Sequence, residues 1–141
     1  MQRLDNLASR LVSTQVSAKH PDDVVICSAV RTSITKAKKD NLKNTSPEVM
    51  ISVALKAAVQ RAKLDPKYVE DLAIGNNLQP KAGQMTDRMV MFLAGFPDTV
   101  PVVAIYRLCS SGLESCAIIA SKINSGIIDL ASWVGLIHVD L

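Results

Sequence analysis

One cysteine of this chain stands where its neighbours favour nucleophilic chemistry. Cys109 follows the strand-like run Val100–Ile105 and directly precedes a helical pattern that extends to about Asn124. We therefore expect Cys109 at a helix amino terminus, where unpaired N–H groups and the positive end of the helix dipole favour the thiolate. The same N–H groups would stabilise the oxyanion that forms when sulfur attacks a carbonyl carbon. Gly112 would leave room for a substrate close to the sulfur.

The spacing alone fits a buried structural cysteine at position 109 equally well. Cys116 lies seven residues further on, which is about two helical turns, so we interpret it as a packed helix residue. The third cysteine is Cys27, and no CxxC pair occurs, which argues against a zinc site or a disulfide framework. Free thiols are typical of a reducing compartment.

The elements that would position Cys109 alternate along the chain after residue 22. Ser46 as a helix cap and Pro47 at the first helical position begin one helix, and Thr86 is expected to cap another. The expected strands are 23–31, 72–76, 100–105 and the stretch from 127 onward, and the expected helices are 46–63, 86–94 and 110–124. This βαβαβαβ order predicts an α/β domain with a mixed, mostly parallel sheet and packed helices. On the last helix, the inward face is expected to carry Leu113, Ala117, Ala120 and Ile123.

The composition of the 141 residues is that of a globular domain, with 48% hydrophobic and 21% charged residues. A net charge of only +3 and an aromatic content of 4% argue against nucleic-acid binding. No apolar run approaches the ~20 residues of a membrane span. The lysine-containing stretch 31–45 would suit a phosphate, but we favour a solvated loop.

The segment YRLCSSGLESCA at 106–117 resembles the active-site motif of the 3-ketoacyl-CoA thiolase family, in which Asn-Arg-Gln precedes Cys-Ser-Ser-Gly-Leu. The resemblance extends over about 22–129, most of the chain. Its other matching segments are DVVICSAVRT, LKNTSPEVM, LAIGNNLQPKAGQ and GFPDTVPVVAIYRLCSSGL.

This resemblance implies a thiolase-like fold and a two-step thioester reaction. Cys109 would attack the 3-keto carbon of a 3-oxoacyl-CoA and release acetyl-CoA, and coenzyme A would then take the shortened acyl group. Coenzyme A is thus expected as a co-substrate, with no other cofactor and no metal, and members of the family form homodimers. In the family a histidine activates the cysteine and a second cysteine protonates the leaving enolate.

Those two partners lie in the carboxyl-terminal half of the family, and their motifs are not found in this sequence. His20 and His138 match no family motif, and the continuation after Asp129 (LASWVGLIHVDL) does not match either. Tyr106 and Leu108 replace the usual Asn and Gln. We therefore expect residues 22–141 to be a truncated amino-terminal thiolase domain that is inactive alone. A ketoacyl synthase, and a non-catalytic subunit that only associates with full-length thiolase, are the alternatives.

The first 21 residues form a separate, targeting-like amphipathic segment. Leu4, Leu7, Ala8 and Leu11 fall on one helical face, and basic residues outnumber acidic ones. The pairs Arg3-Leu4 and Arg10-Leu11 resemble the amino-terminal peroxisomal signal, which a soluble import receptor reads. A mitochondrial presequence and a frayed terminus are the alternatives, and we favour the peroxisome.

Overall fold

The computed structural model describes residues 20–36, 39–77 and 83–136 of the chain. Its centre is a three-stranded sheet of β1 (Asp71–Asn76), β2 (Val102–Tyr106) and β3 (Ala131–Leu136). The strand order is β2-β1-β3, and β1 pairs in parallel with both neighbours. The register places Asn76 beside both Tyr106 and Leu136, so the carboxyl ends of the three strands lie at the same edge.

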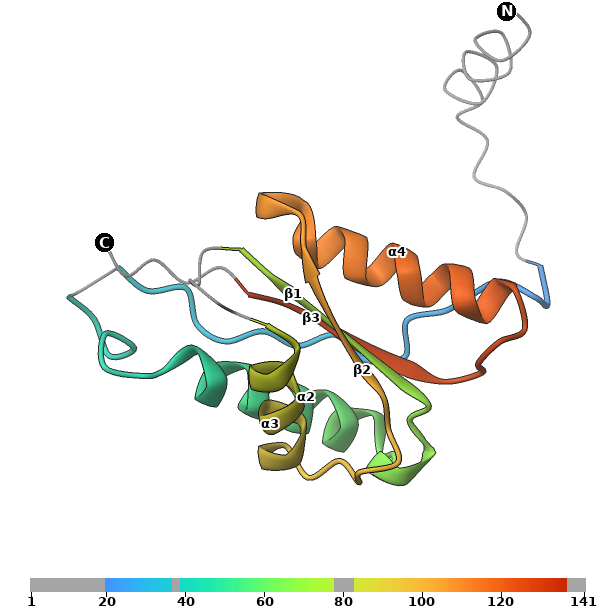
Figure 1. The fold of residues 1–141 in the computed structure, drawn as a ribbon, viewed down its shortest axis with the longest axis horizontal. Helices are drawn as coiled ribbons and strands as arrows, with labels where there is room; N and C mark the ends of the chain where they lie inside the picture. The colour runs from blue at the N-terminus through green and yellow to red at the C-terminus, as the bar shows by residue number, and fades with distance from the viewer. Residues whose placement is uncertain (1–19, 37–38, 78–82, 137–141) are drawn as a thin grey trace, which may run out of the picture.

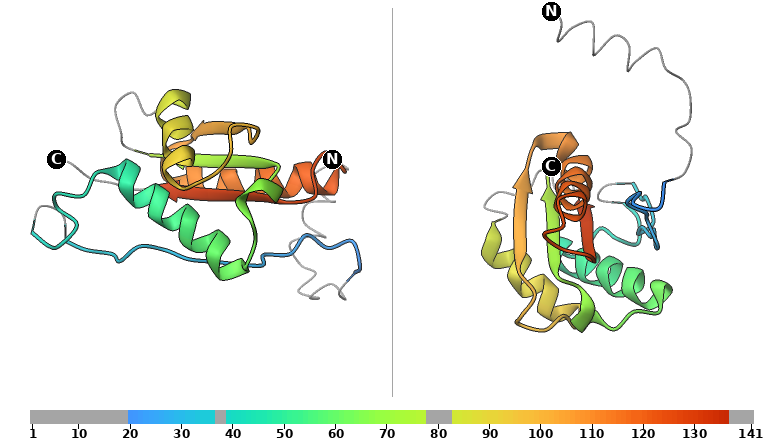
Figure 2. Two further views of the ribbon diagram at one scale, coloured as in Figure 1. Left: turned by 90° about the horizontal axis from the view of Figure 1, so that it is seen from below. Right: turned by 90° about the vertical axis from the view of Figure 1, so that its right-hand side faces the viewer.

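Helices cover both faces of this sheet (Figures 1 and 2). Leu72 and Ile74 of β1 belong to a buried cluster with residues of α2 (Pro47–Ala62) and α3 (Gln84–Leu93). Ala73, which points to the opposite face, is packed in a second cluster with Ile119 of α4 (Ser111–Asn124). This alternation follows from the two-residue period of a strand. The result is a three-layer α/β/α arrangement, so the predicted α/β class and the packed helices are confirmed.

The expected helix ends agree with the structure to within a few residues. Pro47 begins α2, and Lys63 ends it in the left-handed conformation, with φ of 55°. A short 3₁₀ helix, η1 (Pro66–Tyr68), follows. The next long helix, α3, begins at Gln84 with Gly83 in the cap position, two residues before the expected start at Thr86. Gly95 follows this helix with φ of 92°, a conformation that glycine adopts without strain.

The predicted first strand, 23–31, is not a strand in the structure. Val25 is 71% exposed and Ile26 is 60% exposed, and no ladder includes this segment among the described residues. The β-branched residues do favour an extended backbone, but a strand also needs an edge with which to pair. Both edges of β1 are occupied, and residues 23–31 do not pair with the outer edge of β2 or β3. The described part of the chain therefore has the order αβαβαβ, and its three strands are all parallel rather than mixed.

The predicted inward face of α4 is correct at Ile123, which packs against the cluster of Ala73 and Ile119, but wrong at Leu113 and Ala117. Leu113 is 75% exposed, and Ala117 is exposed as well. The buried positions are instead Ser111, Ser115 and Ile119. This helix contacts the sheet so closely at its start that only small side chains fit there. Hydrophobicity, on which the prediction depended, therefore did not decide which face is buried.

Candidate active site at the carboxyl edge of the sheet

Cys109 lies on the turn that joins β2 to α4. A short 3₁₀ helix, η2 (Leu108–Ser110), contains it, and α4 begins two residues later. The thiol is free and the residue is exposed. The sequence-based expectation of a strand that leads through Cys109 into a helix is therefore correct, and the alternative of a sealed structural cysteine does not fit this exposure. The role of the sulfur as a nucleophile stays a prediction.

A buried hydroxyl holds this turn against the end of β1. Ser111 Oγ accepts a hydrogen bond from the backbone N–H of Arg107 at 2.8 Å. The same hydroxyl lies within donor distance of two carbonyl oxygens, that of Asn76 at 2.8 Å and that of Leu108 at 2.6 Å. Leu108 has a φ of 50°, a left-handed conformation that is uncommon for a residue with a branched side chain. These bonds give the backbone a compensating interaction for that conformation.

Three glycines let the first turn of α4 lie directly on the sheet. A Cβ atom at Gly75 of β1 would stand 2.5 Å from the carbonyl carbon and oxygen of Ser111. A Cβ atom at Gly135 of β3 would stand 2.7 Å from the Cα of Gly112. Backbone atoms cannot move aside as a flexible side chain can, so these positions require glycine. The expectation that Gly112 leaves room beside the sulfur is thus only part of its role, because Gly112 also permits contact with β3.

Asn77 is a site residue that the sequence analysis missed. It directly follows β1 and is only 4% exposed. Its side-chain Nδ2 lies 3.9 Å from the sulfur of Cys109, a long donor contact to sulfur. The signal that would have found it is topological. Parallel strands end at one edge, so a polar residue just after one strand lies near the residues that follow the next strand.

The charged groups near the turn neutralise one another. The guanidinium of Arg107 pairs with the carboxylate of Glu114 in the first turn of α4. Arg107 is mostly exposed, so this pair contributes little to stability. Tyr106, at the end of β2, is exposed. Among the residues that the structure describes, the charged groups next to this turn thus form an ion pair.

The other sequence-based candidates do not meet at this site. The targeting residues Arg3, Leu4, Arg10 and Leu11 lie outside the described residues, and so does His138. His20 is the first described residue; it is exposed, and its Nδ1 lies 3.4 Å from Oδ2 of Asp22. Within the described ranges no group of His, Cys, Asp or Glu side chains is suited to hold a metal ion. The same part of the chain contains no helix that is both long and apolar enough to cross a membrane.

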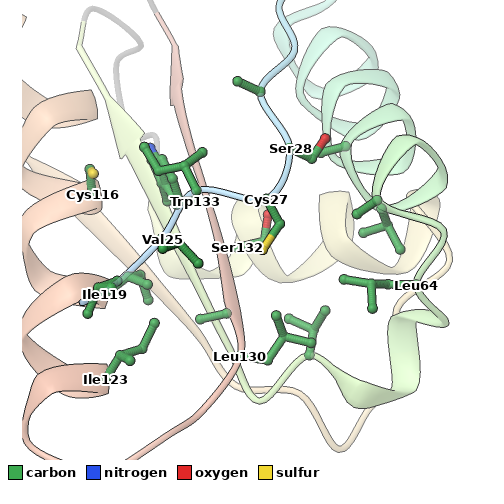
Figure 3. Close-up of a pocket in the computed structure, with 18 of the residues that line it drawn as sticks. Val25, Cys27, Ser28, Leu64, Cys116, Ile119, Ile123, Leu130, Ser132 and Trp133 are labelled. Atoms are coloured by element: carbon green, nitrogen blue, oxygen red, sulfur yellow. The ribbon is translucent and has the colours of Figure 1, made fainter. Parts of the chain in front are cut away.

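A large cavity among the described residues lies away from Cys109 (Figure 3). Its volume is about 540 Å³, and its walls come from 23–30, α2, α4 and 129–134. Cys27 and Cys116 both line this cavity, as does Trp133. Neither Cys109 nor Asn77 contributes to it, so this cavity and the candidate nucleophile are separate features of the fold.

A buried carboxylate lies in the first turn of α3. Asp87 is fully buried, and neither of its carboxylate oxygens has a hydrogen-bond partner within the described ranges. Loss of hydration disfavours the charged form, so burial raises the pKa of Asp87 to about 7. Nothing in the local sequence indicates this burial, because an acidic residue in the first turn of a helix is ordinarily a favourable surface feature.

Fold and site together define a class, namely α/β proteins that present an exposed cysteine at the carboxyl edge of a parallel sheet. The family described as "Thiolase, N-terminal domain" matches residues 24–138. The chain therefore belongs to the thiolase family, and the resemblance seen in its sequence is confirmed.

Named relatives agree with this assignment. A peroxisomal 3-ketoacyl-CoA thiolase of Yarrowia lipolytica is 40% identical, over 96% of this chain and 34% of that protein. The dimeric peroxisomal thiolase of Saccharomyces cerevisiae superposes with a TM-score of 0.73 at 35% identity, covering 80% of this chain and 30% of that one. The Acat5 thiolase of Ascaris suum, solved in complex with coenzyme A, superposes with a TM-score of 0.70 at 30% identity, covering 75% of this chain and 28% of that one. The chain spans about a third of the length of these relatives.

Proposed function

We propose that this chain supplies the nucleophilic-cysteine part of a 3-ketoacyl-CoA thiolase that acts in fatty-acid β-oxidation. The observation that carries the proposal is the placement of Cys109. Its exposed sulfur lies at the start of α4 and within reach of the amide of Asn77. The names of the relatives supply the substrate class, a 3-oxoacyl-CoA, and coenzyme A as the second substrate.

In the proposed reaction, the thiolate of Cys109 attacks the 3-keto carbon of a 3-oxoacyl-CoA. The carbonyl electron pair moves to oxygen, and the N–H groups at the start of α4 favour this oxyanion. When the carbonyl re-forms, the bond between carbons 2 and 3 breaks and its electron pair leaves with the enolate of acetyl-CoA, which takes up a proton. The sulfur then carries the shortened acyl group. The thiolate of coenzyme A attacks this thioester, forms a new acyl-CoA and releases the cysteine.

The proton transfers of this scheme need groups that do not lie near the sulfur among the described residues. His20 is exposed and pairs with Asp22, and Cys116 lines the separate cavity. We therefore propose that the 141-residue chain accepts an acyl group slowly but does not turn over alone. The base and the acid would come from the part of the thiolase sequence that this chain does not match.

Peroxisomal location is part of the same proposal. The relatives carry this location in their names, and the segment 1–21 resembles an import signal carrying Arg3, Leu4, Arg10 and Leu11. A soluble import receptor would read it. The dimeric yeast relative supports a homodimer as the working form of the complete enzyme.

A second candidate function is association with a full-length thiolase without catalysis. Large apolar side chains are exposed near the start and the end of α4, namely Leu108, Leu113 and Ile127. Exposed apolar surface of this kind is typical of a face that another protein surface covers. Co-expression of a tagged chain with a full-length thiolase, followed by co-purification, tests this candidate.

The acylation proposal is tested with acetoacetyl-CoA and intact-protein mass spectrometry. We expect one acetyl group on Cys109, located by peptide mapping, and none in the Cys109→Ser variant. The Cys116→Ser variant is the matched control and should be acetylated like the original chain. Acetylation that persists in Cys109→Ser, or steady release of acetyl-CoA by the purified chain, would overturn the proposal as stated.

A further inference from the structure

We propose that Asn77 is a positioning residue for the nucleophile, whose side-chain amide donates to the sulfur of Cys109 and favours its thiolate form. This inference deepens the proposed function and rests on it for the identity of the nucleophile. It concerns a residue that follows β1, whereas Cys109 follows β2, so the contact joins two strand ends that lie 32 residues apart in sequence.

The position of Asn77 suits a donor of fixed geometry. With 4% exposure its side chain has little freedom to turn toward water. Its neighbour Asn76 offers its backbone carbonyl oxygen to Ser111 Oγ at 2.8 Å, which fastens the end of β1 to the turn that carries the sulfur. The segment that carries Asn77 and the turn that carries Cys109 are therefore joined through the hydroxyl of Ser111. The 3.9 Å between Nδ2 and Sγ is long for a hydrogen bond to a neutral thiol. A negatively charged sulfur attracts the donor more strongly, so the contact favours the thiolate.

Two further groups on the surrounding elements carry charge, and one more can titrate. Arg107 and Glu114 form an ion pair with each other, and Tyr106 is exposed at the end of β2. Because the pair is balanced, it leaves no net charge to favour the thiolate. Within the described ranges, the start of α4 and the amide of Asn77 are then the two features that do so. Replacing Asn77 removes one of them and leaves the helix in place.

A purely structural Asn77 would behave differently from a donor. If its amide only fills space, then Asn77→Ala costs stability but leaves the pH profile of the sulfur unchanged. If it donates to sulfur, Asn77→Ala slows alkylation at a given pH because less thiolate is present, and Asn77→Asp slows it more. The aspartate would replace a donor with a negative charge at nearly the same place, and like charges disfavour the thiolate.

The experiment measures alkylation of Cys109 by iodoacetamide between pH 5 and pH 10. All variants carry Cys27→Ser and Cys116→Ser, so that Cys109 is the one cysteine that iodoacetamide can alkylate. We expect Asn77→Ala to react about three- to tenfold more slowly at pH 7 and to shift the midpoint of the profile to higher pH, as loss of one long hydrogen bond of ordinary net strength implies. Asn77→Asp should be shifted further. Asn124→Ala, at the opposite end of α4, is the matched control and should follow the original profile.

Each outcome decides the proposal. A profile of Asn77→Ala that coincides with the control, in a variant whose Trp133 fluorescence shows a folded chain, overturns the proposal whatever Asn77→Asp does. If Asn77→Ala fails to fold, Asn77→Leu removes the same donor at a similar side-chain volume and gives the comparison, and rates at saturating guanidinium chloride show the unfolded baseline. The measurement needs no acyl substrate, so it is independent of the acetoacetyl-CoA experiment. If acetoacetyl-CoA fails to acylate Cys109 but Asn77→Ala still slows alkylation as expected, the proposed thiolase chemistry is rejected and the role of Asn77 is retained.

Discussion

Asp87 should make the stability of this protein fall as the pH rises from 4 to 7. The unfolded chain releases the proton of this carboxyl near the ordinary pKa of 3.8, whereas the folded protein keeps it until about pH 7. Between these values the folded state binds more protons than the unfolded state, so the free energy of unfolding decreases with pH. The full stability is present below about pH 4, and the loss is complete above about pH 7.

The size of the effect follows from the same two values. The interval from 3.8 to about 7 corresponds to at most about 4 kcal/mol, or about 1.4 kcal/mol for each unit of pH. Such a loss is large beside the roughly 5–15 kcal/mol that is typical of a whole domain. An asparagine side chain has nearly the same shape as the aspartate and does not titrate. We therefore expect Asp87→Asn to become progressively more stable than the original chain as the pH rises to about 7.

The assay is chemical denaturation followed by the fluorescence of Trp133, which is the single tryptophan of the chain. Curves at pH 4.5, 5.5, 6.5 and 7.5 for the original chain and for Asp87→Asn give the difference in unfolding free energy. Asp98→Asn, which changes an exposed acid, is the matched control and should show no such trend. A difference between Asp87→Asn and the original chain that stays constant over this range would refute the reasoning.

Three further changes test how the turn and the sheet are held. Gly75→Ala should destabilise the chain by about 1–3 kcal/mol and slow alkylation of Cys109, because the added methyl would collide with the backbone of α4; thermal unfolding and iodoacetamide labelling measure the two effects. Ser111→Ala should cost about 1–3 kcal/mol, since it leaves the buried groups around that hydroxyl without their partner; unchanged unfolding would count against the assigned hydrogen bonds. Lys122→Met should cost about 1–2 kcal/mol, because Lys122 pairs with the buried carboxylate of Asp71; Lys63→Met, on an exposed lysine, is the control in the same denaturation assay.

Local patterns predicted the elements of this fold well. Capping and proline signals located α2, and the alternation of elements predicted a mostly parallel α/β sheet. The strand-to-helix turn at Cys109 could also be predicted, because both flanking elements have strong periodic patterns. In each case the information lies within a few residues of the feature that it predicts.

Features that depend on distant residues could not be predicted in this way. Whether 23–31 forms a strand depends on pairing with a distant strand edge, and the buried face of α4 depends on glycines in β1 and β3. The contact of Asn77 with Cys109 and the burial of Asp87 likewise arise only when separate elements pack. Residue types alone favoured Leu113 as a core residue, and tertiary packing overrode that preference.

The glycine contacts beneath α4 also affect how this protein can change. Where two elements touch through side chains, a substitution on one can be absorbed by new rotamers on the other. Gly75, Gly112 and Gly135 instead bring main chain against main chain, and nothing at that contact can readjust. The distance of the start of α4 from the sheet is therefore set by van der Waals contact between main-chain atoms. Substitutions on the outward face of α4, for example at Leu113, can therefore change the surface that the helix presents to other molecules without moving the nucleophile.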